Sequence, residues 1–382
     1  MAASLLAACF VFLGSSGFAS GKTGRRHAGA RDVLVLGTPK LLRATNMSRT
    51  RQATPASPFS FGIYPGGPAG TVGPAGTTVP EDPAKRLAAL RELQAPGQPL
   101  LLHVYVGYAG AGTASAADQI GSQISSYTAA GFQVELVLRY QSAGDIAGYV
   151  NFVKQTVDQL GGDPGLVSLQ VTNEANVGGA PNASDGYYQG AEDALIQGVE
   201  AAKAESRATG HTQLRIGFNW AYDTGGGESG FWSYLVRHGG SPFRAALDWV
   251  GIDIYPGTWG PPLSTTTADS VRSWTSSALT KLRSTYMQTA GIAASVPIHI
   301  TEAGYPTGPG RSSATQATVL SGLVGAVSAQ RSKLNLATFC WFDLRDADSS
   351  STSFESQYGL MSDSYTPKPA FGDYQQLIAA GT

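Results

Sequence analysis

Two glutamates at the ends of apolar segments are the residues of this chain best suited to chemistry. Glu174 ends the segment Gln170–Glu174, and Glu302 ends the segment His299–Glu302; small or turn-forming residues follow both. An ionised carboxylate at the end of a buried strand is costly unless it is paired or used. Two such groups aimed at one cleft are the equipment for breaking a glycosidic bond. The sequence therefore predicts a carboxylate pair that acts on sugars.

The segments that must position these glutamates form a repeating pattern. From residue 58 onward, apolar segments alternate with helix-like ones, and most of the apolar segments are nearly continuous. Continuous apolar runs are expected of strands buried on both faces of a parallel sheet. Eight such βα units predict an α/β fold, the (β/α)8 TIM barrel. The predicted strands are Phe59–Tyr64, Leu100–Val106, Phe132–Leu138, Leu166–Thr172, Leu214–Phe218, Trp249–Tyr255, Val296–Thr301 and Ala337–Phe342.

Helical spacing of apolar residues fills several of the intervals between these strands. An open doubly wound sheet is the alternative architecture for such a pattern. It is less well supported, because no Gly-x-Gly-x-x-Gly follows the first strand. The glycine-rich loop Pro65–Pro68 contains prolines, which lack the N–H groups that a phosphate cradle needs. The predicted helices are Pro83–Leu93, Asp145–Leu160, Ala191–Ala208, Ser270–Tyr286 and Ala314–Gln330.

The active sites of (β/α)8 barrels lie at the carboxyl ends of the strands. Glu174 ends the fourth predicted strand and Glu302 the seventh, so their side chains can converge across the mouth. Retaining glycosidases hold the two carboxyl groups about 5–5.5 Å apart, whereas inverting ones need a wider gap for water. One group must be protonated to assist the leaving group, and the other must be ionised to attack the anomeric carbon.

The strand ends carry motifs that resemble glycoside hydrolase clan A. The resemblance rests on Asn173-Glu174 at the fourth strand, Glu302 at the seventh and Trp341 at the eighth, and it covers roughly residues 58–380. It implies that Glu174 is the acid/base, that Glu302 is the nucleophile and that Asn173 binds the sugar 2-hydroxyl. Tyr255, at the end of the sixth strand, matches the tyrosine that often hydrogen-bonds the nucleophile in this clan.

Two short stretches are similar to one family within the clan. Ile254–Pro256 and Glu302–Thr307 resemble the motifs of the family seventeen β-1,3-glucanases. Family five often has a histidine two residues before the strand-six tyrosine, where this chain has Asp253. That departure speaks against a close family-five assignment. The stretch Pro367–Ala370 resembles the clan where the chain enters its last helix.

Basic residues near the predicted strand ends have two interpretations each. Arg139 either orients a carboxylate in the site or pairs with one elsewhere. A salt bridge to Arg139 or Arg345 is likewise the structural alternative for the two glutamates. His103, on the second strand, either reaches the sugar or is hydrogen-bonded within the barrel wall. His299 lies three residues before Glu302, so strand alternation predicts that it points to the opposite side and is structural.

Aromatic residues near strand ends can stack against the apolar face of a sugar while their edge groups form hydrogen bonds. Each of them is otherwise a core residue. Asp253 and Asp343 are further candidates for a polar lining. Because no His/Cys cluster has metal-ligand spacing, neither a metal nor a cofactor is predicted. The aromatic residues predicted to bind substrate are Tyr64, Tyr255, Trp220, Trp259 and Trp341.

Composition narrows the function classes. The net charge is −1 and no long basic run occurs, so nucleic acid is not an expected partner. Hydrophobic residues make up 42% of the chain, enough to build a core and too many for a disordered chain. We expect a monomer that acts on carbohydrate and has no integral membrane domain.

The N-terminal region has the pattern of a targeting segment. Residues 1–20, with the apolar run Leu5–Leu13 followed by small residues, are typical of a signal peptide. Lys22 and Arg25 lie after the run rather than before it, which would favour an uncleaved anchor, although the run is short for a full span. We expect secretion after cleavage near Ser20, a flexible linker over residues 21–57 and a glycoside hydrolase domain over residues 58–382.

The combined prediction is a retaining glycoside hydrolase that cleaves a β-linked polysaccharide or oligosaccharide by double displacement. A transglycosylase would use the same glutamates and pass the sugar to another sugar. A non-catalytic barrel would bind glycans through the same aromatic residues. A lyase or aldolase usually needs a Schiff-base lysine or a metal cluster at the strand ends, and the sequence has neither there.

Overall fold

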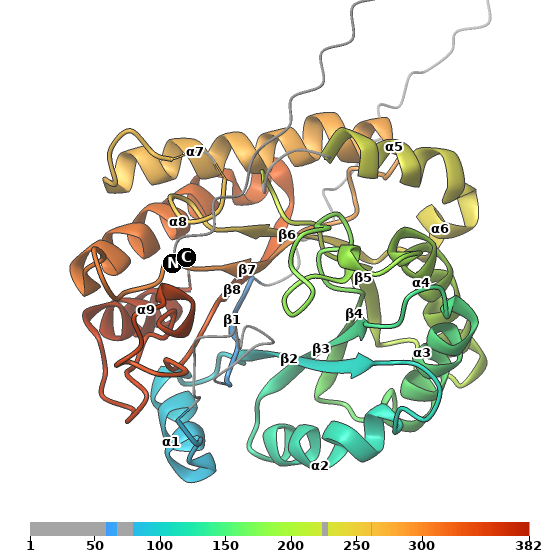
Figure 1. Ribbon diagram of the computed structural model, residues 1–382, viewed down its shortest axis with the longest axis horizontal. Helices are drawn as coiled ribbons and strands as arrows, with labels where there is room; N and C mark the ends of the chain where they lie inside the picture. Colours follow the sequence, from blue (N-terminus) through green and yellow to red (C-terminus); the bar gives the residue numbers. More distant parts are fainter. Residues whose placement is uncertain (1–58, 67–78, 224–227, 261, 382) are drawn as a thin grey trace, which may run out of the picture. The chain divides into compact units, whose positions relative to one another are not determined.

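The computed structural model describes residues 59–66, 79–223, 228–260 and 262–381. Within them, parallel strands β1 to β8 close into a barrel in chain order (Figure 1). The predicted (β/α)8 TIM barrel is confirmed. The open doubly wound sheet is wrong, because β8 pairs with β1 and closes the sheet. The predicted signal peptide, residues 1–20, and the predicted linker, residues 21–57, lie outside the described residues.

The strands match their predicted positions to within two residues at each end. Nearly continuous apolar runs located them because the surrounding helices shield the outer face of the barrel and side chains fill its interior. The strands are β1 (Ser60–Ile63), β2 (Leu101–Tyr108), β3 (Gln133–Tyr140), β4 (Leu166–Val171), β5 (Arg215–Phe218), β6 (Trp249–Ile254), β7 (Ile298–Ala303) and β8 (Leu336–Trp341).

Helices surround the strands in Figure 1. The five predicted helices are confirmed, and the sequence prediction missed α2, α5 and α6. No helix in the described ranges combines the length and the apolar character needed to span a bilayer. The helices are α1 (Pro83–Leu93), α2 (Ala116–Ala129), α3 (Ile146–Leu160), α4 (Ala191–Ala208), α5 (Glu228–His238), α6 (Gly240–Ala246), α7 (Ala268–Lys281) with a π-helical extension (Leu282–Met287), α8 (Ser313–Leu334) and α9 (Pro369–Ala380).

A polar cluster lies inside the barrel. Glu135 on β3 is 3.5 Å from His299 on β7, and these strands are not neighbours, so the contact crosses the interior. His103 on β2 lies 2.9 Å from the same carboxylate, and the ring of Trp249 stacks on His299 at 4.5 Å. Burial acts to raise the pKa of Glu135, but the hydrogen bond from His103 and the nearby ring of His299 hold that pKa well below its usual value.

A β-bulge on β7 determines which of its side chains face inward. Ile252 pairs with Ile300, but the next residue, Asp253, pairs with Glu302, so β7 carries one extra residue. Thr301 and Glu302 therefore both contact groups inside the barrel. The prediction that His299 points away from Glu302 is wrong for this reason, whereas its structural role agrees with its complete burial.

Candidate active site

Glu302 is held by two tyrosines at the mouth of the barrel. The phenol of Tyr105, on β2, donates to Oε1 at 2.5 Å, and the phenol of Tyr255, just after β6, donates to Oε2 at 2.6 Å. Burial, followed by the nearby Glu302 carboxylate, raises the pKa of each phenol well above its usual value, so both remain donors. The two oxygens of Glu302 are thus fixed in orientation, and the residue is only 7% exposed.

Tyr255 is where the sequence prediction placed it, but Tyr105 was missed. A signal was available, because Tyr105 lies two residues after His103 on the same strand. Residues two apart on a strand share a face, and His103 faces the barrel interior.

Glu174 has a different environment. Its Oε2 accepts a hydrogen bond from the hydroxyl of Ser184 at 2.5 Å. Burial of its carboxyl group and then the charge of Glu302 raise the pKa of Glu174 to about 8, although the Ser184 hydrogen bond acts to lower it. Glu174 therefore carries a proton at neutral pH.

Three carboxyl groups meet at this point. One oxygen each from Glu174, Asp253 and Glu302 lies within 4.8 Å of the others. In the described part of the chain this is the single group of acidic, histidine or cysteine side chains close enough to surround a cation. Both oxygens of Asp253 already accept hydrogen bonds, from Asn219 and Thr301, each at 2.5 Å. These hydrogen bonds occupy one acceptor position on each oxygen of Asp253, and spacing alone assigns no metal to the trio.

Asp253 connects the Glu174 side of the site to the Glu302 side. Asn219, one residue after β5, donates to Asp253 and accepts from the backbone N–H of Glu174 at 2.8 Å. Thr301, next to Glu302, donates to the other oxygen of Asp253. Burial, followed by the charges of Glu302 and Glu174, raises the pKa of Asp253 well above its usual value. The sequence prediction missed Asn219, although a polar residue directly after a predicted strand was the signal available.

The backbone beside Glu174 is strained. Thr172 and Glu174 have φ angles of 63° and 48°, in the left-handed region that costs most residues about 1–3 kcal/mol. The three successive N–H groups of residues 172 to 174 donate to the side chains of Tyr149, Asp185 and Asn219, at 3.1, 2.7 and 2.8 Å. Side chains from three different elements therefore hold this turn in place.

Asn173 lies within the same turn and is 4% exposed. Its side-chain oxygen accepts from Asn219 at 2.8 Å and from Gln170 at 3.2 Å. Its amide nitrogen donates to the carbonyl of Ala183 at 2.9 Å, and an amide nitrogen carries a second hydrogen. The structure therefore brings Asn173 together with Glu174, in one network of amide hydrogen bonds.

The predicted basic residues pair away from the two glutamates. Arg139 forms an ion pair with Asp185 at 3.0 Å. Of the two interpretations of Arg139, the structure therefore supports pairing with a carboxylate other than the two glutamates. Arg345 donates to the carbonyls of Asp363 and Val79. His103 is fully buried and pairs with Glu135, so it belongs to the barrel wall. Within the described residues, the salt-bridge alternative for the two glutamates is therefore not found.

Trp341 and Trp220 were predicted to bind substrate, but both are fully buried in the core. Trp341 shares its strand face with Phe339, whose ring packs against Tyr374 on α9. That face points toward the helices rather than the mouth. Trp220 packs against aromatic residues of the core, including Trp232 at 5.7 Å.

Phe342, the residue after Trp341, takes the place at the site that was predicted for the tryptophan. Its ring stacks on Tyr64 at 5.3 Å and lies edge-on to Tyr255 at 6.3 Å. The half-buried Tyr64 in turn meets the ring of Tyr105 edge-on at 5.3 Å. Tyr64 therefore belongs to an aromatic wall that continues to the two tyrosines bound to Glu302.

Trp259 is the exposed aromatic residue of this region. It is 39% exposed, and its ring lies 5.7 Å from Phe354, in the loop after β8. The guanidinium of Arg311 lies over the rings of Tyr305 and Phe354, at 4.7 and 4.8 Å. The loops after β6, β7 and β8 thus form a rim of stacked groups beside the aromatic wall.

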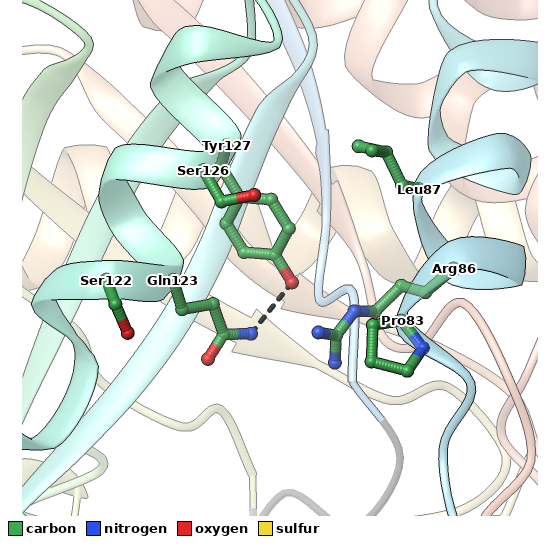
Figure 2. Close-up of a pocket in the computed structure, with 7 residues that line it drawn as sticks. All are labelled: Pro83, Arg86, Leu87, Ser122, Gln123, Ser126 and Tyr127. Atoms are coloured by element: carbon green, nitrogen blue, oxygen red, sulfur yellow. Dashed lines mark hydrogen bonds between the residues drawn. The ribbon is translucent and has the colours of Figure 1, made fainter.

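A hollow lies between α1 and α2 and has a volume of about 240 Å³. Figure 2 shows Gln123 directed at the hydroxyl of Tyr127, to which it donates at 2.8 Å, with Arg86 on the opposite side. Neither Glu174 nor Glu302 lines this hollow, so it is separate from the carboxylate site.

Comparisons with known proteins support the fold. No protein-family model and no curated protein matches the sequence. Among solved structures, a β-glucosidase from Exiguobacterium marinum matches with a TM-score of 0.57 and 12% identity, over 85% of this chain and 99% of that one. The apo structure of a β-glucosidase, 1317, matches with a TM-score of 0.54 and 16% identity, over 78% and 87% of the two chains.

A β-D-glucuronidase from Dictyoglomus thermophilum matches with a TM-score of 0.53 and 10% identity, over 78% of this chain and 46% of that one. This chain therefore spans about half the length of that glucuronidase, and it covers 50% of one from an uncultured Clostridium species. At such identities the likeness establishes a shared barrel fold, and the assignment of an activity rests on the site.

Proposed function

We propose that this protein is a retaining glycoside hydrolase, with Glu174 as acid/base and Glu302 as nucleophile. The observation that carries the proposal is the meeting of two carboxyl groups within 4.8 Å in opposite environments. An approach of at most 4.8 Å between one oxygen of each group fits the roughly 5–5.5 Å between the carboxyl groups of retaining enzymes better than the wider gap that inverting enzymes need for water.

The two environments match the two roles. Glu174 has a pKa raised to about 8, so at neutral pH it holds the proton that a leaving group needs. Glu302 accepts from two phenols that remain protonated, so its carboxylate is held in one orientation for attack. The same hydrogen bonds limit its rotation away from the anomeric carbon.

In the first step, Glu302 forms a bond to C1 of the sugar while the glycosidic C–O bond breaks. Glu174 gives its proton to the departing oxygen. In the second step, Glu174 takes a proton from water, the water oxygen bonds to C1, and the C1–Glu302 bond breaks. Two inversions at C1 give net retention.

The change of role at Glu174 follows from electrostatics. The charge of Glu302 is one cause of the raised pKa of Glu174. That charge disappears when Glu302 becomes an ester to the sugar, so the pKa of Glu174 falls in the intermediate. Glu174 is then ionised when the second step needs a base.

For the substrate, we propose a β-linked oligosaccharide or polysaccharide. The solved structures with this fold include enzymes named β-glucosidase and β-glucuronidase. The aromatic wall and the exposed Trp259 are suited to stacking against successive sugar rings. Membership of clan A, with motifs similar to those of family seventeen, is part of this proposal, as are secretion and a monomeric state. N-terminal sequencing of the mature protein tests this cleavage. A sequence that starts at Met1 would contradict cleavage near Ser20.

Azide rescue tests the two assignments separately. Glu302→Ala should abolish turnover, and azide should partly restore it with a glycosyl azide of inverted anomeric configuration. Glu174→Ala with azide should give the retained configuration, because azide then attacks the glycosyl-enzyme. Wild-type turnover in Glu302→Ala would remove the nucleophile assignment. Product analysis at high acceptor concentration distinguishes a transglycosylase, and glycan retention without new reducing ends would indicate a non-catalytic binding protein.

A further inference from the structure

The loop between β4 and α4, residues 175 to 190, folds back over the site. Its Ser184 is 1% exposed and donates its hydroxyl to Oε2 of Glu174 at 2.5 Å. The neighbouring carbonyl of Ala183 accepts from the side chain of Asn173 at 2.9 Å. Ser184 is therefore a buried donor aimed at one carboxyl oxygen.

An ion pair fixes the position of this loop. Arg139 on β3 donates through Nε to Asp185 at 3.0 Å and through Nη1 to the carbonyl of Asn182 at 2.8 Å. The other oxygen of Asp185 accepts the backbone N–H groups of Tyr140 and Asn173, both at 2.7 Å. Asp185 is fully buried and Arg139 is 6% exposed.

The backbone of the loop is also tied to the turn that carries Glu174. The N–H of Asp185 donates to the carbonyl of Asn173 at 2.8 Å, and that of Gly186 donates to the carbonyl of Glu174 at 3.4 Å. The position of the Ser184 hydroxyl relative to the Glu174 carboxyl is thus fixed from both sides. A hydroxyl held in this way does not have to be ordered when the carboxyl changes its protonation state.

We propose that Ser184 is a positioning residue that favours the ionised form of Glu174 and so supports its action as a base in the second step. The proposal rests on the proposed function and deepens it. A hydroxyl that donates to a carboxylate stabilises the charged form more than the neutral one. The Arg139–Asp185 ion pair supports the ionised form of Glu174 indirectly, because it holds the loop that carries Ser184.

Charged groups around Glu174 come from four elements. Apart from burial, Glu302 on β7 raises the pKa of Glu174, and Asp185 in the loop does so more weakly. Asp253 on β6 lies beside the same two glutamates, whose charges raise the pKa of Asp253. Arg139 on β3 lowers the pKa of Glu174, as does the Ser184 hydrogen bond. The Ser184 hydroxyl thus lowers the pKa of Glu174, against the effect of the neighbouring carboxylates, and carries no charge of its own.

The test is the titration of Glu174 itself, followed by NMR of 13C-labelled glutamate side chains, with Glu174→Gln to assign the signal. In Ser184→Ala the titration midpoint should rise by about 0.5 to 1 pH unit. Ser184→Thr keeps the hydroxyl and should keep the wild-type midpoint. An unchanged midpoint in Ser184→Ala would overturn the proposal. This readout needs no turnover, so a wild-type protein without hydrolase activity would remove the proposed function and leave this test in force.

One control is specific to this chain. Asn182-Ala183-Ser184 fits the N-glycosylation pattern, so Ser184→Ala also removes an acceptor site in a host that glycosylates. Asn182→Gln removes the same site, keeps the hydroxyl and keeps the backbone carbonyl that Arg139 binds. Its Glu174 midpoint should equal that of the wild type. A midpoint shift in Asn182→Gln as large as that in Ser184→Ala would assign the effect to the glycan and overturn the role of the hydroxyl.

The pH dependence of the kinetic constants should shift in the same direction as the titration midpoint of Glu174. For substrates with poor leaving groups, the basic limb of kcat/KM reports Glu174 in the free enzyme. For activated aryl glycosides, which need little acid assistance, the acidic limb of kcat reports Glu174 in the glycosyl-enzyme. Both limbs should move to higher pH in Ser184→Ala and return in Ser184→Thr. A uniform loss of rate with neither limb displaced would mean that Ser184 only packs against the site, and would overturn the proposal.

Discussion

The phenol of Tyr105 on β2 reaches across the barrel to Glu302 on β7, with 2.5 Å between Oη and Oε1. Tyr255 holds the other oxygen of the same carboxylate. The two donors bind different oxygens of Glu302 and come from different strand ends, so one hydrogen bond can be removed while the other remains. This arrangement makes the two tyrosines separately testable.

Tyr105→Phe should lower kcat about 10- to 100-fold with little change in KM. A hydrogen bond to a charged group contributes about 1.5–3 kcal/mol, and each 1.36 kcal/mol is tenfold in rate. Steady-state kinetics measures the effect. Tyr108→Phe is the matched control on the same strand, because its hydroxyl donates to Asp145, away from the site. Equal losses in the two variants would show that the strand, rather than the contact with Glu302, was disturbed.

The pH dependence of kcat/KM should have a basic limb near pH 8. Glu174 must be protonated to assist the leaving group, and burial and Glu302 raise the pKa of Glu174 to about 8. Activity should therefore decline as the pH rises through that value. A pH–rate profile with a substrate that has a poor leaving group measures it. A limb that stays at pH 8 in Glu174→Ala would have to be assigned to another group.

Glu174→Gln should stabilise the fold at neutral pH. The pKa of Glu174 is raised from 4.5 in the reference state to about 8 in the folded protein. Below pH 4.5 the group is protonated in both states, so it affects stability little. As the pH rises from 4.5 to 8, the unfolded chain ionises while the folded protein does not, and the folded state loses stability.

The gain from Glu174→Gln should therefore be small at pH 4 and reach about 1–3 kcal/mol at pH 8, or a few degrees in Tm. Thermal unfolding of both proteins at the two pH values measures it. A gain of equal size at pH 4 and pH 8 would point to packing rather than to charge as its cause.

Asp253→Ala should lower kcat about 100-fold, because displacing a catalytic group by about 1 Å costs that much. Asp253 joins Asn219 to Thr301, and its removal leaves Glu174 and Glu302 without this connection. Asp253→Asn retains the shape and an acceptor for Asn219, so its loss should be smaller. Single-turnover kinetics locates the effect in the chemical steps. Equal rates in Asp253→Ala and the wild type would contradict a spacing role.

Trp259→Ala should lower kcat/KM about tenfold for oligosaccharides of four or more units, by analogy with the loss of a stacking contact of about 1.5 kcal/mol. Aryl monoglycosides should be cleaved as by the wild type, because Trp259 lies at the rim rather than beside the two glutamates. A comparison of substrates of increasing length measures this difference. An equal loss on the monoglycoside would place the ring at the reacting sugar.

The strands were predictable because burial on both sides of a barrel strand leaves a nearly continuous apolar run, such as Leu100–Val106, which only His103 interrupts. Glu174, Glu302, Asn173 and Tyr255 could be predicted as site residues because they lie at strand ends, where the active sites of this fold are found. Helices such as α2 were missed because the buried face of α2 is narrow, and small and polar residues such as Gly121 and Ser122 separate Ile120 from Ile124 in the sequence.

Side-chain direction was harder to predict from sequence. Trp341 and Phe342 are adjacent, and only strand pairing decides which of them faces the mouth. The bulge on β7 reverses the inward–outward alternation of side chains after Ile300, and no local sequence pattern indicates the extra residue. The contact of Ser184 with Glu174 depends on a loop whose course is set by the distant Arg139, so no pattern within the loop would have predicted it.

The extra residue on β7 has a consequence for engineering. If a strand of the same length but without the bulge were transplanted here, the alternation would run on undisturbed, and a glutamate three residues after the inward-facing histidine would be turned outward to the helical layer. A chimeric barrel of that kind would retain every catalytic residue type in its sequence and still be inert. Libraries that recombine barrel segments of this architecture should therefore exchange β6 and β7 as one unit, so that the paired strands keep their mismatch in length.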